Sequence, residues 1–238
     1  MNKSDFIQRM KTDKKSQTTI NRNIEYTEYF NRYLQRIKNI KIEDAQPKDI
    51  VDFKDWAEKN NLKKLRMHIW SISTYYKYLD KKQMFLKANE LMGSIGLDQY
   101  RLSTFPGINK GFVNKLENIG IKTARQLLDI GHTKDGREKL FKATGIPKKH
   151  ILELIKLSDL ARITGVKKIR ARLYYESGLD TLEKMAKCDP EELRKISAKY
   201  IKNSGFDGVP PKPKEAEHTV TMAKYLIENR DHFNFQAL

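Results

Sequence analysis

Apolar residues along this chain recur every three or four positions, with polar residues between them. This spacing is typical of α-helices that bury one face and expose the other. No stretch alternates apolar and polar residues for long enough to predict a β-strand. The pattern therefore predicts an all-α protein.

The first half of the sequence predicts four helices. Pro47 suits the first turn of the second one, because its missing N–H has no partner at that position. Gly93 and Gly96 interrupt the pattern, so we expect the fourth helix to end before them and a domain boundary to follow within 93–103. The expected helix ranges are about 18–38, 47–57, 62–79 and 83–92.

The second half contains an internal repeat built around glycines. The segment FPGINKGFVNKLENIGIKTARQLL, from Phe105, aligns without gaps on ITGVKKIRARLYYESGLDTLEKM, from Ile163. A third glycine turn, in TGIPKKHILELIKL, lies between the copies at Gly145. The matched glycines are Gly107 with Gly165 and Gly120 with Gly178, and both pairs are 58 positions apart (165 − 107 and 178 − 120).

Helix-start signals and a linker complete the outline. Thr123 with Gln126 predicts a capping box, and Asp189 before Pro190 predicts another helix start. The stretch SGFDGVPPKPKEAE is rich in Gly, Pro and charge and predicts a linker before a last helix at about 215–229. The expected domains are residues 1–95, residues 100–205 and a linker with its helix at 206–238.

The net charge of the chain limits the classes of ligand that we expect it to bind. The chain has 47 Lys and Arg against 30 Asp and Glu, a formal net charge of +17, which attracts polyanions such as DNA, RNA and anionic membranes. No apolar run long enough to span a bilayer and no secretory signal occur, so we expect no membrane partner. A single cysteine and scattered histidines predict no disulfide, no metal site and no cofactor. We therefore expect a cytoplasmic protein, which would be nucleoid-associated if the polyanion it attracts is DNA.

The glycine turns have a chemistry of their own. Glycine readily takes a positive φ, which lets two helices meet across a tight turn. We expect Ile108 and Val166 to point inward from these turns. The N–H groups that open the next helix lack helical partners and lie at the positive end of its dipole, where a phosphate binds well. Lys110 and Lys168 are placed to add charge beside them.

Residues 105–123 and 163–181 resemble the two halves of a helix-hairpin-helix pair, a module that binds the DNA backbone without reading sequence. The layout of about 100–205 also resembles an uncharacterised bacterial and archaeal helix-hairpin-helix domain of unknown function. The family hairpin is Gly-apolar-Gly, whereas here Asn109 and Lys167 replace the second glycine. Because Asn tolerates φ > 0 better than Lys, we expect the first hairpin to be the backbone clamp. The second should depend on the side chains of Lys167, Lys168, Arg170 and Arg172.

The first half resembles the SAM-like core-binding domain of tyrosine recombinases and phage integrases. TTINRNIEYTEYFNRYL, IEDAQPKDIVDFKDWAEK and KKLRMHIWSISTYYKYL carry this resemblance, which implies a four-helix bundle on one face of a duplex. The recombinase catalytic domain has no counterpart, so strand exchange is not expected. We expect Trp70, Tyr75 and Tyr76 to be core residues rather than base-stacking platforms.

No constellation for catalysis is recognisable, so we predict a protein that is not an enzyme. The leading hypothesis is largely sequence-independent binding of double-stranded DNA, in chromosome organisation or as an accessory to recombination or repair. A protein-interaction adaptor and an RNA-binding protein with structural hairpins remain as alternatives. The sequence leaves the oligomeric state open. The predicted DNA-binding residues are Gly107, Asn109, Lys110, Gly111, Lys148, Lys149, Gly165, Lys167, Lys168, Arg170, Arg172, Lys63, Lys64 and Arg66.

Overall fold

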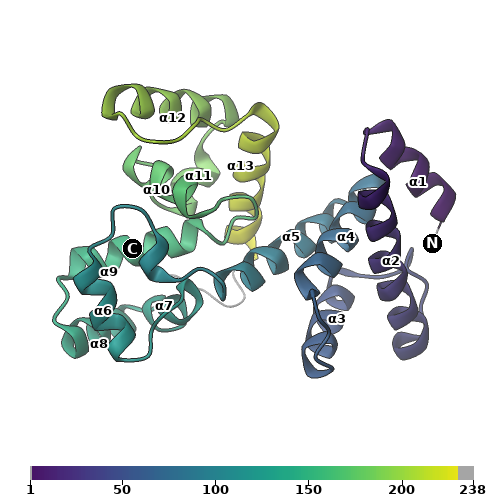
Figure 1. Ribbon diagram of the computed structural model, residues 1–238, viewed down its shortest axis with the longest axis horizontal. Helices are drawn as coiled ribbons and strands as arrows, with labels where there is room; N and C mark the ends of the chain where they lie inside the picture. The colour runs from purple at the N-terminus through teal and green to yellow at the C-terminus, as the bar shows by residue number, and fades with distance from the viewer. Residues whose placement is uncertain (1, 230–238) are drawn as a thin grey trace. The chain divides into compact units, whose positions relative to one another are not determined.

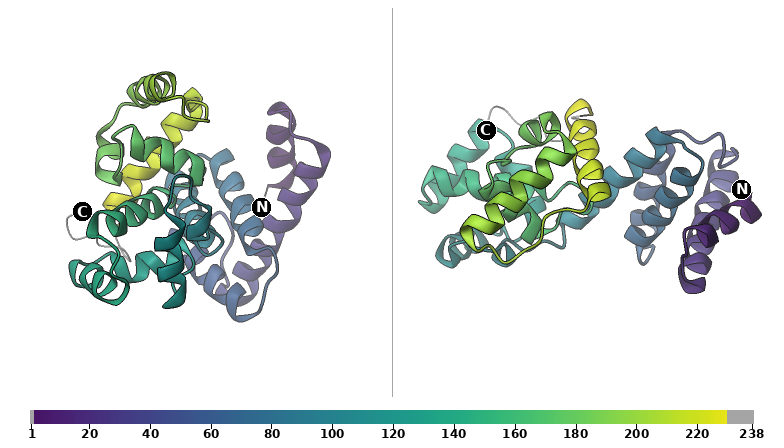
Figure 2. Two further views of the ribbon diagram at one scale, coloured as in Figure 1. Left: turned by 60° about the vertical axis from the view of Figure 1, so that its left-hand side comes forward. Right: turned by 90° about the horizontal axis from the view of Figure 1, so that it is seen from above.

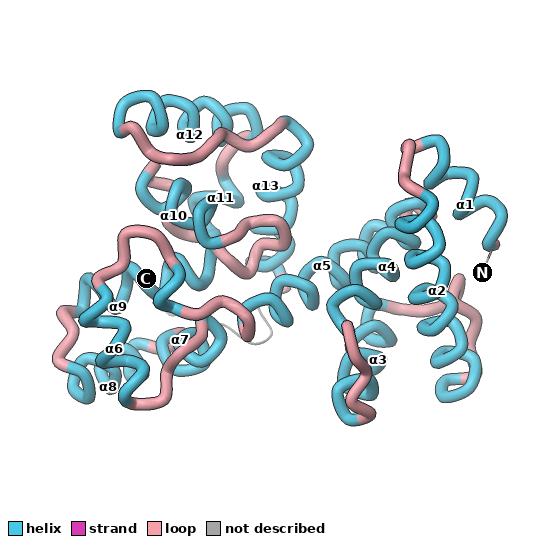
Figure 3. The backbone as a smooth tube through the Cα atoms, in the orientation of Figure 1, coloured by secondary structure: helices cyan, strands magenta, loops and turns pink. Residues whose placement is uncertain are grey.

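The computed structural model describes residues 2–229, and this part of the chain is built from helices joined by short loops (Figures 1 and 3). It contains no β-strand, and the isolated bridge between Arg101 and Thr123 is its one described piece of β pairing. The prediction of an all-α protein is confirmed. Within residues 2–229, no helix is both long and apolar enough to cross a membrane.

Backbone contacts divide the chain into two compact units, residues 1–92 and residues 93–238. The division falls inside one helix, α5 (Lys82–Leu97). The predicted end of this helix before Gly93 is therefore wrong. Each unit has its own buried apolar core and is described by itself below.

The first unit begins with a helix that the sequence pattern did not predict, α1. Its apolar residues are only Phe6, Ile7 and Met10, and the side chains of Phe6 and Met10, one turn apart, are buried. Phe6 meets the ring of Tyr75 edge-on, with centroids 5.2 Å apart. The other helices lie close to their predicted ranges. The elements are α1 (Lys3–Thr12), α2 (Gln17–Tyr33), the π-turn η1 (Leu34–Lys38), α3 (Pro47–Lys59), α4 (Leu65–Tyr78) and the first part of α5.

Aromatic side chains fill the core between α2, α3 and α4. Tyr75 and Tyr76 are both buried, and the Tyr76 hydroxyl donates to the carbonyl oxygen of Ile42 at 2.8 Å, so their prediction as core residues is confirmed. Trp70 is half-buried, with the guanidinium of Arg22 5.0 Å from its ring. This contact makes Trp70 part of the fold rather than a free platform.

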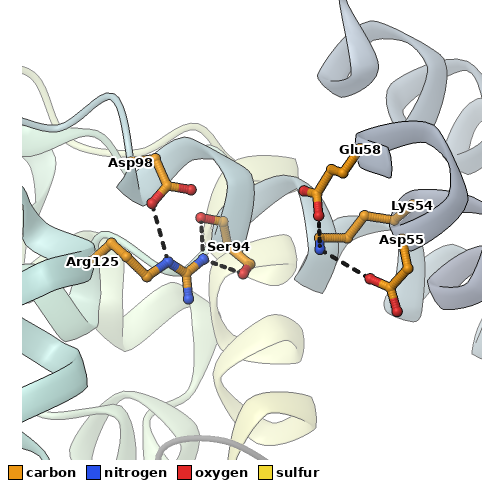
Figure 4. A network of polar contacts seen from close by, with 6 residues as sticks. All are labelled: Lys54, Asp55, Glu58, Ser94, Asp98 and Arg125. Atoms are coloured by element: carbon orange, nitrogen blue, oxygen red, sulfur yellow. Dashed lines mark hydrogen bonds and ion pairs between the residues drawn. The ribbon is translucent and has the colours of Figure 1, made fainter. Parts of the chain in front are cut away.

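Local signals set the ends of these helices. Pro47 occupies the first turn of α3 as predicted, and the Asp49 carboxylate accepts a hydrogen bond from the backbone N–H of Gln46 at 2.8 Å. Further along α3, Lys54 contacts Glu58 at 2.9 Å and Asp55 at 3.3 Å (Figure 4). Such surface ion pairs each contribute only a few tenths of a kcal/mol.

The second unit contains the end of α5, from Gly93, and the helical elements that follow it in the chain. Its last helix, α13, packs against α11 and α12 and therefore belongs to the same unit (Figures 1 and 2). The predicted segment 206–238 extends past Asn229, and its last nine residues lie outside the described part. The elements are the 3₁₀ turn η2 (Leu102–Thr104), α6 (Lys110–Asn118), α7 (Ala124–Gly131), α8 (Lys134–Thr144), α9 (Lys148–Leu160), α10 (Lys168–Glu176), α11 (Leu182–Lys187), α12 (Pro190–Ser204) and α13 (Pro213–Glu228).

Close packing explains why α5 continues through glycine. A Cβ placed on Gly93 would lie 1.9 Å from the carbonyl oxygen of Arg162, so only glycine fits this approach. Arg125 of α7 holds the same turn of α5: its guanidinium donates to the carbonyl oxygen of Ser94 at 2.6 Å and pairs with Asp98 at 3.3 Å (Figure 4). These contacts favour helix where local propensity alone predicts a break.

Candidate nucleic-acid interface

The predicted repeat is present in three dimensions. Helices α6 and α10 have nine residues each and begin 58 positions apart (168 − 110), and α7 and α11 begin at the same offset (182 − 124). Two threonines at this offset, Thr123 and Thr181, cap α7 and α11 with their side chains, and Gln126 completes the predicted capping box. The matched glycines all have positive φ: 71° at Gly107, 93° at Gly165, 86° at Gly120 and 89° at Gly178.

The turn that precedes α10 requires glycine for its backbone conformation rather than for space. Nothing lies within 4 Å of the position that a Cβ on Gly165 would take, but its φ of 93° is costly for any other residue. The next residue, Val166, is buried as expected, whereas its counterpart Ile108 is only half-buried. Each turn is thus anchored on its apolar residue and exposes its glycine.

In the first hairpin, a side chain already occupies backbone N–H donors at the start of α6. Asn109 is the N-cap of α6 and has a φ of −67°, so the expectation that it replaces glycine at φ > 0 is wrong. Its side-chain oxygen accepts hydrogen bonds from the N–H groups of Gly111, at 2.8 Å, and Phe112, at 3.4 Å. The Asn109 side chain therefore caps α6 and occupies two N–H donors that a phosphate would otherwise use.

The second hairpin leaves the equivalent donors without a side-chain cap. Lys167 is the N-cap of α10, with a φ of −100°, and makes no capping hydrogen bond. Its side chain is exposed, and that of Lys168 is half-buried. Neither lysine has a carboxylate within ion-pair distance in the described part of the chain. The structure therefore reverses the predicted ranking, because the backbone donors at α10 are more open to an anion than those at α6.

Arg172 stabilises the fold and is not available to phosphate. Its side chain is 5% exposed, and its guanidinium pairs with Glu153 at 2.6 Å and Glu176 at 2.9 Å. The same group donates to the carbonyl oxygen of Pro106 at 2.7 Å, in the turn of the first hairpin. The expectation that Arg172 contacts DNA is inconsistent with this burial.

Arg170, also expected to contact phosphate, pairs with Glu215 of α13 at 3.2 Å. The backbone N–H of Lys212 and the Arg170 guanidinium together hold the pKa of the Glu215 carboxyl below its usual range. Arg170 is thus partly engaged within the unit. The free charge of the second hairpin is that of Lys167 and Lys168.

The third glycine turn lies beside the first hairpin. Gly145 ends α8 with a φ of 62°, and the Lys115 amine of α6 lies 3.9 Å from the position its Cβ would occupy. Phe112 meets the ring of His150 with centroids 4.7 Å apart, which brings the starts of α6 and α9 together. Lys115 was not predicted as a site residue, because only tertiary contacts bring it to this turn.

Of the two lysines that open α9, Lys149 is exposed, and no ion pair engages it in the described residues. Lys148 pairs with Glu138 at 2.5 Å and lies over the ring of Phe141. At the site, exposed Lys110, Lys115 and Lys149 therefore surround the first hairpin and the third turn.

The remaining predicted residues belong to the first unit. Lys63 and Lys64 are exposed at the start of α4, where Lys64 has a φ of 60°. Arg66 is half-buried and donates to the carbonyl oxygen of Met92 at 3.4 Å. Lys63 and Lys64 thus remain accessible, and Arg66 is engaged within its own unit.

The surface of the second unit offers positive charge and backbone N–H donors at the glycine turns. Within residues 2–229, no three His, Cys, Asp or Glu side chains are placed to hold a metal ion. Although burial raises the pKa of Asp180, hydrogen bonds from Lys156 and Lys184 hold it below its usual value, so this carboxylate stays ionised in a structural cluster. The arrangement is suited to binding an extended anion.

Neither a curated protein nor a solved structure shows a significant match to this chain. One protein family does match, and it is described as "Domain of unknown function (DUF4332)". The match covers residues 106–226, from the first glycine hairpin into the last turn of α13, which is more than half of the 238 residues. The chain therefore belongs to the DUF4332 family.

Proposed function

We propose that this protein binds double-stranded DNA largely without regard to sequence and is not an enzyme. The observation that carries the proposal is the duplicated glycine turn, with two copies of the same helix start 58 residues apart and exposed lysines at both. Such turns hold a phosphate by geometry and charge, which do not depend on the base. The helix-hairpin-helix resemblance of the two copies supports the same function.

The two hairpins contribute differently under this proposal. At α10, uncapped backbone N–H groups donate to a phosphate oxygen, and the helix dipole favours its negative charge. Lys167 and Lys168 add positive charge beside it. At α6, the Asn109 cap already uses two donors, so Lys110 and the neighbouring Lys115 and Lys149 provide the contact through their amines.

We further propose that the first unit supplies another contact surface for the duplex. The positive charge is shared between the units: the first has 20 Lys and Arg against 12 Asp and Glu, and the second has 27 against 18. Exposed Lys63 and Lys64 at the start of α4 are its candidate phosphate contacts. The resemblance to an integrase core-binding domain supports this role. Under this proposal the protein acts at the nucleoid, in the cytoplasm.

Charge removal at the hairpins tests the proposal. The variant Lys110→Gln/Lys167→Gln/Lys168→Gln should bind a duplex more weakly than the wild type. The variant Lys139→Gln/Lys184→Gln/Lys224→Gln loses the same charge at three exposed lysines away from the hairpin turns and is the matched control. Equal affinities for the two variants would contradict the proposed role of the hairpins. Competition by structured RNA at concentrations where duplex DNA does not compete would favour RNA as the ligand.

A further inference from the structure

Helix α12 carries three exposed lysines, Lys195, Lys199 and Lys202, on its outward face. At 100° per residue, these positions lie within about 60° of one another, on the side opposite the buried Leu193 and Ser197. We name these three residues the α12 lysine stripe. No sequence motif marks it, and it lies outside the glycine turns.

The stripe differs from other basic positions on the helices of this chain. Several such positions have a carboxylate one turn away, as in the pairs of Arg9 with Asp5, Lys54 with Glu58 and Lys139 with Asp135. On α12, by contrast, Lys199 and Lys202 have no acidic residue three or four positions away, because the sequence from Leu193 to Ser204 contains none. Lys195 has Glu191 and Glu192 at those spacings but pairs with neither. In the described part of the chain, none of the three stripe lysines has a carboxylate within ion-pair distance.

The acidic residues of α12 are confined to its first turn. Glu191 there pairs with Arg194 at 2.5 Å, and in the described residues neither Glu191 nor Glu192 lies within ion-pair distance of a stripe lysine. The Asp189 side chain caps the helix. Like charges one turn apart destabilise a helix, so the stripe is unfavourable for the isolated fold. An external anion that lies along the helix removes this repulsion.

The helix is held firmly enough to serve as a platform. It packs against α10 and α13, and the Arg194 guanidinium donates to the carbonyl oxygen of Pro211 at 3.2 Å. With a rise of about 1.5 Å per residue, the stripe extends over about 10 Å. Each strand of a duplex presents one phosphate per about 3.4 Å of its axis, so the stripe matches about three phosphates.

We propose that the α12 lysine stripe is a second phosphate-binding surface for duplex DNA, separate from the glycine turns. The inference rests on the proposed function and extends it. The ligand is the sugar–phosphate backbone, because lysine amines on an exposed helix contact charge and carry no arrangement for reading bases. The protein therefore holds DNA at more than one place on its second unit.

The test compares salt dependence of duplex binding for Lys195→Gln/Lys199→Gln/Lys202→Gln and for the matched control Lys139→Gln/Lys184→Gln/Lys224→Gln. Removing three phosphate contacts should make the slope of log affinity against log salt shallower by about 2.7, since each contact contributes about 0.9. The control should keep the wild-type slope. The variant Lys195→Arg/Lys199→Arg/Lys202→Arg should keep the wild-type slope as well, which guards against loss of fold as the cause.

Two negative outcomes have different meanings. If the wild type binds duplex DNA and the stripe variant retains its affinity and slope, the stripe is not a binding surface, and the proposed function stands on the hairpins alone. If the wild type does not bind duplex DNA at low salt, the proposed function and the stripe proposal both fail. Loss of slope in both the glutamine and the arginine variants would also overturn the stripe proposal.

Discussion

Arg172 Nε donates a hydrogen bond to the carbonyl oxygen of Pro106 at 2.7 Å and so joins the two glycine-turn repeats. Arg172 belongs to the helix that follows the second hairpin, and Pro106 lies in the turn of the first. The same guanidinium is fixed by Glu153 and Glu176 and lies against Gly107. One buried side chain therefore sets the position of the first turn relative to α9 and α10.

Loss of this side chain should destabilise the second unit. In Arg172→Ala, the Glu153 carboxylate loses its partner and the Pro106 carbonyl loses its donor, and breaking such a buried pair costs about 3 kcal/mol of unfolding free energy. Urea denaturation measures the change. The control Glu176→Gln removes a carboxylate whose side chain is 38% exposed and should cost less than about 1 kcal/mol. Equal losses in the two variants would contradict a central role for Arg172.

The backbone conformation of the second hairpin predicts a specific effect of alanine. Gly165→Ala places a Cβ in open space but at a φ of 93°, so it should lower the unfolding free energy by about 1–2 kcal/mol through backbone strain alone. Gly165→Asn should lose less, because Asn tolerates the left-handed region better. Thermal unfolding of both variants tests this order, and an alanine variant as stable as the wild type would refute it.

The cap of the first hairpin is testable in the same way. Asn109→Ala removes the acceptor for the N–H groups of Gly111 and Phe112 and should cost about 1 kcal/mol of stability. Asn109→Ser keeps a capping oxygen and should remain within a few tenths of a kcal/mol of the wild type. Chemical denaturation distinguishes the two. If serine is as destabilising as alanine, the Asn109 side chain does more than cap the helix.

His68 predicts the pH dependence of stability in the first unit. Burial lowers the pKa of this imidazole from 6.5 to about 4, and its ring stacks on Tyr26 with centroids 4.2 Å apart. Below pH 6.5 the unfolded chain binds a proton that the folded chain does not, so stability falls as the pH drops from 6.5 towards 4, by up to about 3 kcal/mol. His68→Phe keeps a ring and should lack this component between those pH values. Identical pH profiles of the two proteins would contradict the assignment.

Features set by local sequence could be predicted, and features set by tertiary contacts could not. The helices of the first unit other than α1, the repeat and the caps at Thr123 and Asp189 follow from spacing and residue type alone. The continuation of α5 through Gly93 depends on the Arg162 carbonyl, a partner far along the chain. The pattern of apolar residues contains no information about such a partner.

For the candidate site, too, the sequence predicted only what local residues determine. The sequence identified both glycine turns, but it assigned the open backbone to the hairpin with Asn109 rather than to the one with Lys167. The error arose because an Asn in a turn can either take φ > 0 or cap the next helix, and sequence does not separate these uses. Likewise, Arg172 is indistinguishable from its basic neighbours until its pairing with Glu153 is known.

The most direct test of the central claim is a titration of the wild-type protein against a short duplex of arbitrary sequence over a range of salt concentrations. Several lysine–phosphate contacts predict a linear plot of log affinity against log salt with a slope steeper than about −3, at about 0.9 per contact. The slope should be shallower by about 2.7 in Lys110→Gln/Lys167→Gln/Lys168→Gln. Absence of duplex binding at low salt, or binding that does not change with salt, would contradict the account.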